Sequence, residues 1–496
     1  MFKRILILLG SFLGLLLVYV TLRTFTDPRR QLEVKPIQVP EARPDAVARL
    51  AKSVTFQTVA GDPQRKIDPQ PFYDFQAFLQ ESFPTVYEQL RVEQVAGLSL
   101  LFTWPGSNPD LKPIVLLGHQ DVVPIASEER WSYPPWDSTV AEGFIWGRGT
   151  LDDKVTVMGL LEAAERLLQE GFVPERTIYL AFGHDEETLG SGAQAMADLL
   201  DSRGVQAEFI MDEGSAITRG LVPGIKKEVA LVAIAEKGFL TVTLNVKLED
   251  GGHSSLPPQE LAIEILSRAI VKIRKKRPRA RLSEPMVALF DYLGPEMSFP
   301  LNVVAANQDL LAPIIASVVS GQSPSGNASV RTTVAPTIIQ SGTRENILPT
   351  VAQATVNLRI LPGETVTSTV DFLNRVIDDS RVGILIPEPD NIFEPTDPAS
   401  PESFGYRTIE CSIKEVYPEV LVGPSLAVGY TDVRRYSALS QDLYRFLPFR
   451  ADGEELKRIH GIDERISIED FSSALKFYEQ IIRNGSRASL GEGESE

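Results

Sequence analysis

The stretch Pro113-Ile-Val-Leu-Leu-Gly118-His119-Gln120-Asp121 decides the fold, because it combines a short apolar run with polar residues at its end. Near-continuous apolarity over such a length is typical of a strand that is buried on both faces. Two similar runs follow at 177–183 and 207–211, and residues 156–170 carry apolar side chains at helical spacing. This alternation predicts an α/β layer around a mostly central sheet.

A different pattern begins near residue 239. The segments LTVTLNVKLED (240–250) and ATVNLRI (354–360) alternate between apolar and polar residues, which predicts a sheet with one solvated face. After about residue 395 the first pattern returns, and it ends in an amphipathic helix over 468–482. The predicted parts are a first α/β part at 45–238, an inserted α+β domain at 239–395 and a second α/β part at 396–482.

The two ends of the chain differ from its middle. Residues 5–22 are apolar and uncharged, and they are long enough to predict an N-terminal membrane anchor within 1–23. We expect the globular part to lie outside the cytoplasm, and a cleaved signal peptide with a secreted product is the alternative. A linker rich in proline and charge is expected at 24–44, and a disordered tail at 483–496.

The composition of the chain excludes one class of partner and one kind of covalent link. A formal net charge of −17 argues against a nucleic-acid partner, because the phosphates would be repelled. The single cysteine, Cys411, excludes an internal disulfide. The composition is otherwise that of a globular protein.

Polar residues of the ligand type follow each of the three predicted buried strands. His119 follows the first, Glu186 and Glu187 the second, and Asp212 the third. Ligands of open α/β sheets gather beyond the carboxyl ends of the strands, so this pattern predicts a metal site there. A metal-bound imidazole commonly donates its other N–H to a carboxylate, and Asp121 is placed to accept it from His119.

The segment Trp146-Gly-Arg-Gly-Thr-Leu-Asp152-Asp153-Lys154 adds a further carboxylate. Its glycines permit a tight turn, which would present Asp152 where a carboxylate can bridge two cations. The alternative is that Asp152 and Asp153 only cap the following helix. The adjacent Glu186 and Glu187 suit a division between general base and metal ligand, and a solvated acidic loop is their alternative.

Six segments carry a family resemblance: GHQDVVP, WGRGTLDDK, DEETLGS, MDEG, GGHSS and IHGIDE, in that order. They resemble the motifs of the carboxypeptidase S and aminoacylase-1 family of dizinc metallohydrolases, over residues 45–482. The stretch from RTTVAPTIIQ to VNLRILPGET resembles the carboxypeptidase S branch, which includes N-fatty-acyl-amino-acid synthase/hydrolases. The resemblance implies a dizinc exopeptidase-type α/β domain, with a central mixed sheet flanked by helices and interrupted by an α+β lid.

The resemblance also implies roles for particular residues. His119, Asp152 and Asp212 would hold one zinc ion, and Asp152, Glu187 and His460 the other. Cobalt or manganese would suit the same mixed ligand set. Glu186 would be the general base and Asp121 the partner of His119. His253 would stabilise the oxyanion, from the other subunit in dimeric relatives, and Arg359 and Asn346 would contact the substrate, with Arg359 binding a carboxylate.

The activity implied is hydrolysis of the amide bond of N-acyl amino acids or small peptides that carry a free carboxylate, with synthesis as the reverse reaction. A dipeptidase or carboxypeptidase specificity is the alternative within the family. A non-catalytic, receptor-like relative is the alternative from another class. Whether the chain forms a homodimer, and which acyl group and amino acid it prefers, stay open.

Overall fold

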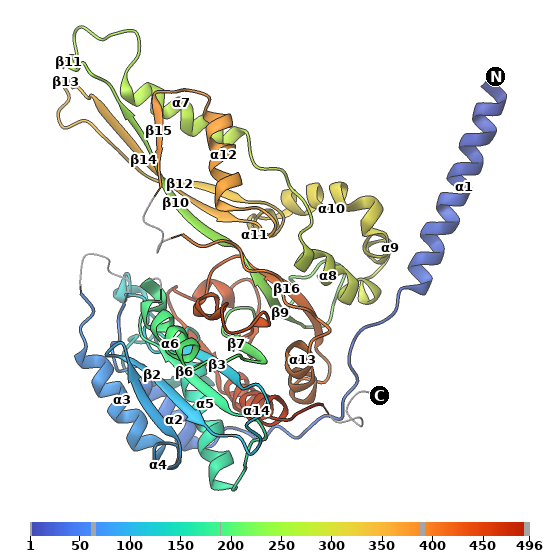
Figure 1. Ribbon diagram of the computed structural model, residues 1–496, viewed down its shortest axis with the longest axis vertical. Helices are drawn as coiled ribbons and strands as arrows, with labels where there is room; N and C mark the ends of the chain where they lie inside the picture. The colour runs from blue at the N-terminus through green and yellow to red at the C-terminus, as the bar shows by residue number, and fades with distance from the viewer. Residues whose placement is uncertain (1, 61–65, 189, 387–391, 491–496) are drawn as a thin grey trace.

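The described residues form four sheets, and the largest, of ten strands, carries the strands predicted to surround the site (Figure 1). The smallest are a pair, β11 (Gly252–His253) and β13 (Ile347–Leu348), and a three-stranded sheet of β19 (Arg465–Ser467), β5 (Phe144–Trp146) and β4 (Thr139–Ala141). The computed structural model describes residues 2–60, 66–188, 190–386 and 392–490. The strands of the ten-stranded sheet, in spatial order, are β1 (Arg91–Val95), β2 (Ser99–Trp104), β6 (Ile178–Gly183), β3 (Ile114–His119), β7 (Phe209–Asp212), β17 (Leu443–Arg445), β9 (Val229–Glu236), β8 (Ile217–Thr218) and β18 (Arg450–Ala451), with β16 (Leu421–Ala427) paired to β9.

The three predicted buried strands are confirmed, and they are neighbours. Strand β3 pairs in parallel with both β6 and β7, whereas β2 pairs antiparallel with β6, so the sheet is mixed. Alternate residues of β3 enter different apolar layers, with Leu116 in one and Val115 and Leu117 in the other. This burial on both faces is what the continuous apolar run requires.

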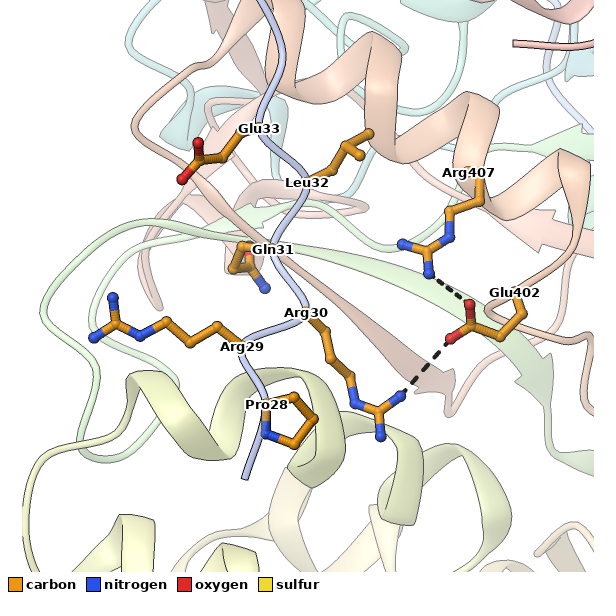
Figure 2. A pocket seen from close by; sticks show the side chains of 8 residues that line it. All are labelled: Pro28, Arg29, Arg30, Gln31, Leu32, Glu33, Glu402 and Arg407. Carbon is orange, nitrogen blue, oxygen red and sulfur yellow. Dashed lines mark hydrogen bonds and ion pairs between the residues drawn. The ribbon is translucent and has the colours of Figure 1, made fainter. Parts of the chain in front are cut away.

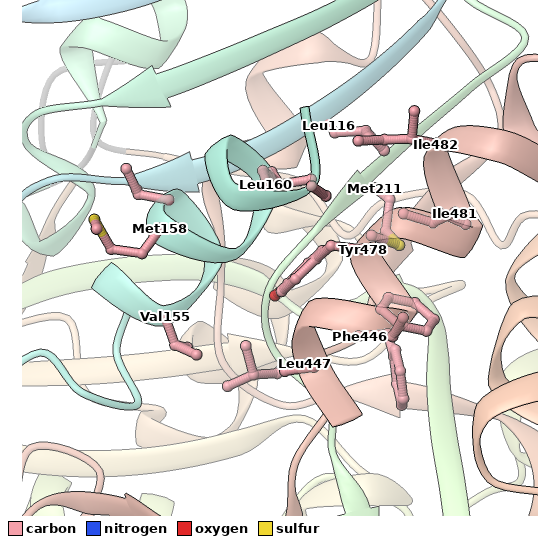
Figure 3. Close-up of a cluster of buried hydrophobic side chains, with 14 of the residues drawn as sticks. Leu116, Val155, Met158, Leu160, Met211, Phe446, Leu447, Tyr478, Ile481 and Ile482 are labelled. Carbon is pink, nitrogen blue, oxygen red and sulfur yellow. The ribbon is translucent and has the colours of Figure 1, made fainter. Parts of the chain in front are cut away.

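Helices cover both faces of the large sheet. On one face, α5 (Lys154–Gln169) packs against α14 (Ile468–Gly485), which confirms both predicted helices. Figure 3 shows Tyr478 of α14 among side chains from α5 and the strands, and its hydroxyl donates to Thr156 Oγ1 at 2.9 Å. The other helices of this part are α2 (Pro44–Ser53), α3 (Gln70–Ser82), α4 (Pro84–Gln89), α6 (Ser191–Ser202), which packs on the opposite face, and α13 (Phe404–Val416).

The second sheet has its own core. Its strands, in spatial order, are β12 (Thr333–Ser341), β14 (Val351–Ile360), β10 (Gly238–Lys247) and β15 (Val382–Leu385). Helices α7 (Ala262–Lys275) and α12 (Val366–Ile377) cover one face. Alternate residues of β10, from Leu240 to Val246, are fully buried, as the strict alternation predicts.

The segment between α7 and β12 is helical, and its first helix packs on the large sheet. It comprises α8 (Glu284–Leu293), α9 (Leu301–Ala306), α10 (Gln308–Gln322) and α11 (Pro324–Ser329). Helix α8 packs against β16, and Leu293 shares an apolar cluster with Val229 and Leu421. Part of the sequence between 239 and 395 therefore completes the core of the catalytic sheet.

The N-terminal segment forms α1 (Phe2–Thr26). Throughout the described residues, no helix combines the length and the apolarity that crossing a bilayer requires, so the predicted membrane anchor and membrane-bound location are wrong. Polar contacts join the last turns of α1 to the body instead. Arg23 Nη1 lies 2.6 Å from Asp309 Oδ2, and Asn307 Nδ2 donates to the main-chain oxygen of Val20 at 3.4 Å. The alternative of a secreted chain stays a prediction.

The segment after α1 follows the surface of the body in extended form. The side-chain amide of Gln31 donates to Val422 O and accepts from Val422 N, both at 2.8 Å, so it pairs with β16 as a strand residue would. Figure 2 shows Glu402 between Arg30 and Arg407, with its carboxylate contacting both guanidinium groups.

The other end of the chain is packed beyond the predicted start of the tail. Asn484 is buried and donates to Glu415 Oε2 at 2.9 Å, and α14 continues to Gly485. The final residues of the predicted tail, 491–496, lie outside the described part of the chain.

Candidate metal centre

The parallel strands bring the predicted strand-end residues together. His119 is the last residue of β3, and Glu186 and Glu187 lie in a short 3-10 helix, η2 (Glu186–Thr188), just after β6. His119 is in register with Gly183, the last residue of β6. The carboxyl ends of β3 and β6 therefore place the imidazole beside the acidic turn.

Asp152 lies between two histidines from distant parts of the sequence. Its Oδ1 is 2.9 Å from His119 Nε2, and its Oδ2 is 2.9 Å from His460 Nε2. One carboxylate thus faces both imidazoles, which is the arrangement expected of a ligand that bridges two cations. Asp153, not Asp152, occupies the N-cap position of α5.

The turn that presents Asp152 is held from the other end of the chain. The Glu464 carboxylate accepts hydrogen bonds from the main-chain N–H groups of Gly149, Leu151 and Asp152, at 2.9, 2.9 and 3.2 Å. It also forms a buried ion pair with Arg148. Gly149 has φ of +90°, so a residue without a Cβ is required there, as the glycine-rich sequence predicts.

Asp121 organises the first histidine and the acidic turn together. Its Oδ1 lies 3.3 Å from His119 Nδ1, and the two carboxylate oxygens accept from Glu186 N and Glu187 N at 3.2 and 3.1 Å. His119 Nδ1 also lies 3.0 Å from the main-chain oxygen of Asp121. A fully buried carboxylate in this position sets the imidazole orientation and the direction in which the two glutamates point.

Glu187 completes a compact donor group. Donor atoms of His119, Asp152 and Glu187 all lie within 4.8 Å of one another, and Glu187 Oε1 is 3.0 Å from His460 Nε2. Glu186, its neighbour, is buried, and burial raises its pKa well above the usual range. The two glutamates are therefore in different environments, as a base and a ligand would be.

Asp212, predicted as a ligand, accepts two main-chain hydrogen bonds. Its Oδ1 accepts from Glu213 N at 3.0 Å and its Oδ2 accepts from Val433 N at 2.8 Å. The next residue, Glu213, is also buried, and its Oε2 atom has no hydrogen-bond partner. Burial, with Asp212 and Asp153 nearby, raises the pKa of Glu213 well above its usual value, and the charge of His119 opposes this shift. Glu213 is a candidate ligand that the sequence argument missed, although the motif MDEG contains both acids.

The electrostatics of this cluster fit a bound cation. Burial raises the pKa of Glu186, Glu187 and Glu213, because each carboxylate loses water without gaining enough positive charge. Burial opposes the charged imidazole of His119, but hydrogen bonds to Asp121 and Asp152 raise its pKa well above the usual range. A divalent ion would supply the missing positive charge, and the His and carboxylate donors are those that such ions take.

His460 reaches this cluster from a loop after β18. Hydrogen bonds to Asp152 and Glu187 raise the pKa of His460 to about 10. Its φ is +59°, and the following Gly461 donates its N–H to Arg458 O at 2.8 Å, so a tight turn directs the imidazole toward Asp152. No spacing rule would have selected this histidine.

Two predicted residues lie far from the metal cluster. This cluster comprises the side chains of His119, Asp152, Glu187 and His460. His253 is on β11 (Gly252–His253), which pairs with β13 (Ile347–Leu348) at the tip of the lid (Figure 1). Asn346 precedes β13, and its main-chain oxygen accepts from Ser254 N at 3.1 Å. Both are exposed, so the structure brings them together but not to His119.

Arg359 belongs to the lid sheet, but it lies near charged groups of the large sheet. It lies on β14, directly opposite Phe239 of β10. Burial lowers the pKa of Arg359, and the nearby charges include that of Glu186. Its guanidinium therefore lies on the side of the lid sheet that faces the catalytic carboxylates.

Comparisons with known proteins show which sequences and folds the chain is similar to. The model of "Peptidase family M20/M25/M40" matches residues 115–484. The chain is 40% identical to the probable carboxypeptidase S-like 2 of Dictyostelium discoideum, over 88% of this chain and 84% of that protein. It is 37% identical to an N-fatty-acyl-amino acid synthase/hydrolase of Homo sapiens, over 98% and 97% of the two chains. The fold resembles that of an M20 family metallo-carboxypeptidase from Sulfolobus solfataricus, with a TM-score of 0.65, 16% identity, and coverage of 90% and 100%.

Proposed function

The chain belongs to the peptidase family M20/M25/M40, and we propose that it is a two-zinc hydrolase of amide bonds that lie next to a free carboxylate. Relatives that match most of its length are hydrolases or peptidases, which makes this chain an enzyme and removes the receptor-like alternative. The observation that carries the proposal is the Asp152 carboxylate, which contacts both His119 and His460 at 2.9 Å.

The proposed ligand sets share Asp152. His119, Asp152 and one carboxylate of the Asp212–Glu213 pair would hold one ion, and Asp152, Glu187 and His460 would hold the other. Mixed imidazole and carboxylate donors suit zinc, and cobalt or manganese would also fit. The bound ions would polarise the amide carbonyl and make a water molecule more acidic.

The residues of the chain would carry the proton transfers. Glu186, buried beside the ligand Glu187, takes a proton from the attacking water and returns it to the leaving amine. Asp121 keeps the His119 imidazole and the Glu186–Glu187 turn in place through its three contacts.

The substrate would be an N-acyl amino acid or a small peptide with a free carboxylate, and the reverse reaction would join a fatty acid to an amino acid. This follows from the human relative, which is named as an N-fatty-acyl-amino acid synthase/hydrolase. Carboxypeptidase activity is the second candidate, because the Dictyostelium relative is named as carboxypeptidase S-like. Turnover of long-chain N-acyl amino acids, compared with that of C-terminal dipeptides, separates the two.

Two substitutions test the catalytic assignment. Glu186→Gln should keep both metal ions and lose roughly 1,000-fold in kcat, because the general base is gone while the ligands remain. His119→Ala should lose metal as well as turnover. Metal analysis and steady-state kinetics on the same preparations distinguish these results, and Glu88→Gln on α4 removes an equal charge from an exposed position as the control. A Glu186→Gln enzyme that turns over near the wild-type rate contradicts the assignment.

We also propose that the lid tip acts on a second copy of the chain. His253 is exposed, and its Nδ1 lies 2.8 Å from Ser255 Oγ, while the metal cluster of its own chain lies in the other sheet. A homodimer would allow His253 and Asn346 of one copy to reach the metal cluster of the other, where His253 would stabilise the oxyanion.

A further inference from the structure

A buried arginine stacked on Tyr430 has no hydrogen-bond or ion-pair partner in the part of the chain that the structure describes. Arg434, in the short 3-10 helix η5 (Asp432–Tyr436), is 7% exposed. Its Nε, Nη1 and Nη2 atoms are all without a hydrogen-bond partner among the described residues. An unpaired buried charge is costly, so a guanidinium in this state is suited to receive an anion.

Aromatic rings cover the faces of this guanidinium. The Arg434 Cζ atom lies 4.0 Å from the centroid of the Phe393 ring and 4.0 Å from that of Tyr430. Stacking on a ring uses the face of the planar guanidinium and leaves the N–H groups pointing outward in its plane. The two rings therefore orient the N–H groups as well as partly offsetting the cost of burial.

Arg359 stacks on the same tyrosine. Its Cζ lies 5.1 Å from the Tyr430 centroid and 4.7 Å from that of Phe239. Arg359 Nη1 is also buried without a hydrogen-bond partner. Two guanidinium groups with unused N–H donors thus flank Tyr430, and each belongs to a different part of the chain.

The backbone around Arg434 is anchored to two buried carboxylates of the large sheet. Val433 N donates to Asp212 Oδ2 at 2.8 Å, and Thr431 N donates to Glu236 Oε2 at 3.2 Å. Burial raises the pKa of the Tyr430 hydroxyl to about 12, and the nearby charge of Glu186 contributes to this shift. The two hydrogen bonds anchor the main chain on both sides of Asp432, next to Arg434, and Tyr430, on which Arg434 stacks, lies near Glu186.

We propose that Arg434, with Arg359, binds the free carboxylate of the substrate, so that Arg434 determines specificity for acids over neutral amides. This inference rests on the proposed amide hydrolase activity. A carboxylate accepts two parallel N–H donors from a guanidinium, and the aromatic faces keep water from competing for the Arg434 donors. The ligand class is the α-carboxylate of an N-acyl amino acid or a peptide.

The kinetic test compares an N-acyl amino acid with its C-terminal carboxamide. Arg434→Gln should lower kcat/KM for the acid by about 10- to 100-fold, mainly through KM, because hydrogen bonds to a charged group are lost. The carboxamide rate should change little, so the ratio of acid to amide falls. Arg434→Lys keeps the positive charge but loses the two parallel N–H donors of the guanidinium, and it should give an intermediate ratio of acid to amide. Arg435→Gln removes an equal charge at the next position, where Arg435 contacts the Phe393 ring at 4.5 Å, and should keep the wild-type ratio.

A binding measurement separates failure of this inference from failure of the proposed activity. In the metal-loaded Glu186→Gln protein, calorimetry should show binding of the N-acyl amino acid that Arg434→Gln weakens by a similar factor. A folded Arg434→Gln enzyme with the wild-type ratio overturns the proposal, as does an equal loss for acid and amide in both Arg434 variants. If the wild-type chain hydrolyses no amide, the proposed activity fails, and calorimetry still decides whether Arg434 binds the carboxylate. If Arg434→Gln does not fold, as judged by its melting temperature, Arg434→Lys decides by the same ratio.

Discussion

The two acids of the MDEG motif lie close together, and they differ in the main-chain hydrogen bonds that their carboxylates accept. Both oxygens of Asp212 accept main-chain N–H groups, whereas Glu213 Oε2 is buried and unpaired. We predict that Glu213→Gln leaves one zinc ion per chain in place of the two that we propose, or weakens the binding of one ion by at least 10-fold. Metal analysis after dialysis against a fixed free zinc concentration measures this.

Asp212→Asn is the matched comparison, since it removes one charge at the adjacent position. It should keep both ions and lower the free energy of unfolding by about 1–3 kcal/mol, because one acceptor of a main-chain N–H becomes a donor. The reverse pattern, with metal lost in Asp212→Asn and kept in Glu213→Gln, would return the ligand role to Asp212.

Where two acids are adjacent, the residue types alone do not predict which of them binds a metal ion. Asp212 is the last residue of β7 and Glu213 follows the strand, so the alternation of a strand does not decide which of the two side chains would bind a metal ion. The residue types and the strand ends predicted His119, Glu186 and Glu187 correctly as neighbours. The orientation at the end of β7 depends on η5, whose Val433 takes one Asp212 oxygen, and no local pattern reveals that contact.

The turn before α5 depends on one glutamate from the far end of the sequence. Glu464 accepts three main-chain N–H groups of residues 149–152 and pairs with Arg148 in the interior. We predict that Glu464→Gln lowers the free energy of unfolding by about 3–5 kcal/mol, because it leaves the Arg148 charge buried without its partner. It should also weaken metal binding by about 10- to 100-fold, since Asp152 is then held less firmly. Urea unfolding and zinc titration give the two values.

The neighbouring Asp463 provides the control for that prediction. Its carboxylate accepts from Ser132 N and Ser132 Oγ at 2.6 and 2.8 Å, at an exposed site. Asp463→Asn should cost about 1 kcal/mol and leave the zinc affinity unchanged. Equal costs for Asp463→Asn and Glu464→Gln would show that Glu464 does not organise the turn.

Elements with a strong hydrophobic period were predictable, and elements defined by packing were not. The alternation in β10 and the apolar stripe of α14 reflect a single buried face, which local sequence records directly. The apolar run within α1 was misread as a membrane anchor, because apolarity alone does not distinguish among the surfaces that a helix can contact. The place of α8 on β16 depends on contacts such as Leu293 with Leu421, which only the folded chain brings together.

The arrangement of the whole chain separates the two sets of predicted residues. The metal cluster lies at the large sheet, and His253 and Asn346 lie at the tip of the other sheet (Figure 1). We propose boundaries near 239 and 395 for the lid, because the residues between them include a four-stranded sheet with its own apolar core. The sequence predicted His253 as a catalytic group. It could not show whether His253 acts at the metal cluster of its own chain or at that of a second copy.

A complementation experiment tests whether the lid tip acts between two copies. Glu186→Gln and His253→Ala chains should each be nearly inactive alone, one lacking the base and the other the oxyanion donor. In a mixed dimer, one site would combine the intact Glu186 of one chain with the intact His253 of the other. Random exchange in a two-fold dimer therefore predicts recovery of about a quarter of the wild-type rate.

The control pair is Glu186→Gln with His119→Ala, since both changes fall at the metal cluster of the same sheet. If that cluster accepts only the lid tip from a partner, the control mixture leaves no site with both His119 and Glu186 intact, and its rate should stay at the sum of the separate rates. The same result for the Glu186→Gln and His253→Ala mixture, in chains that light scattering shows to be dimeric and exchanging, would mean that His253 serves its own chain. The lid would then have to swing toward the large sheet, and the segment between β9 and β10 around Lys237 would be the place to bend.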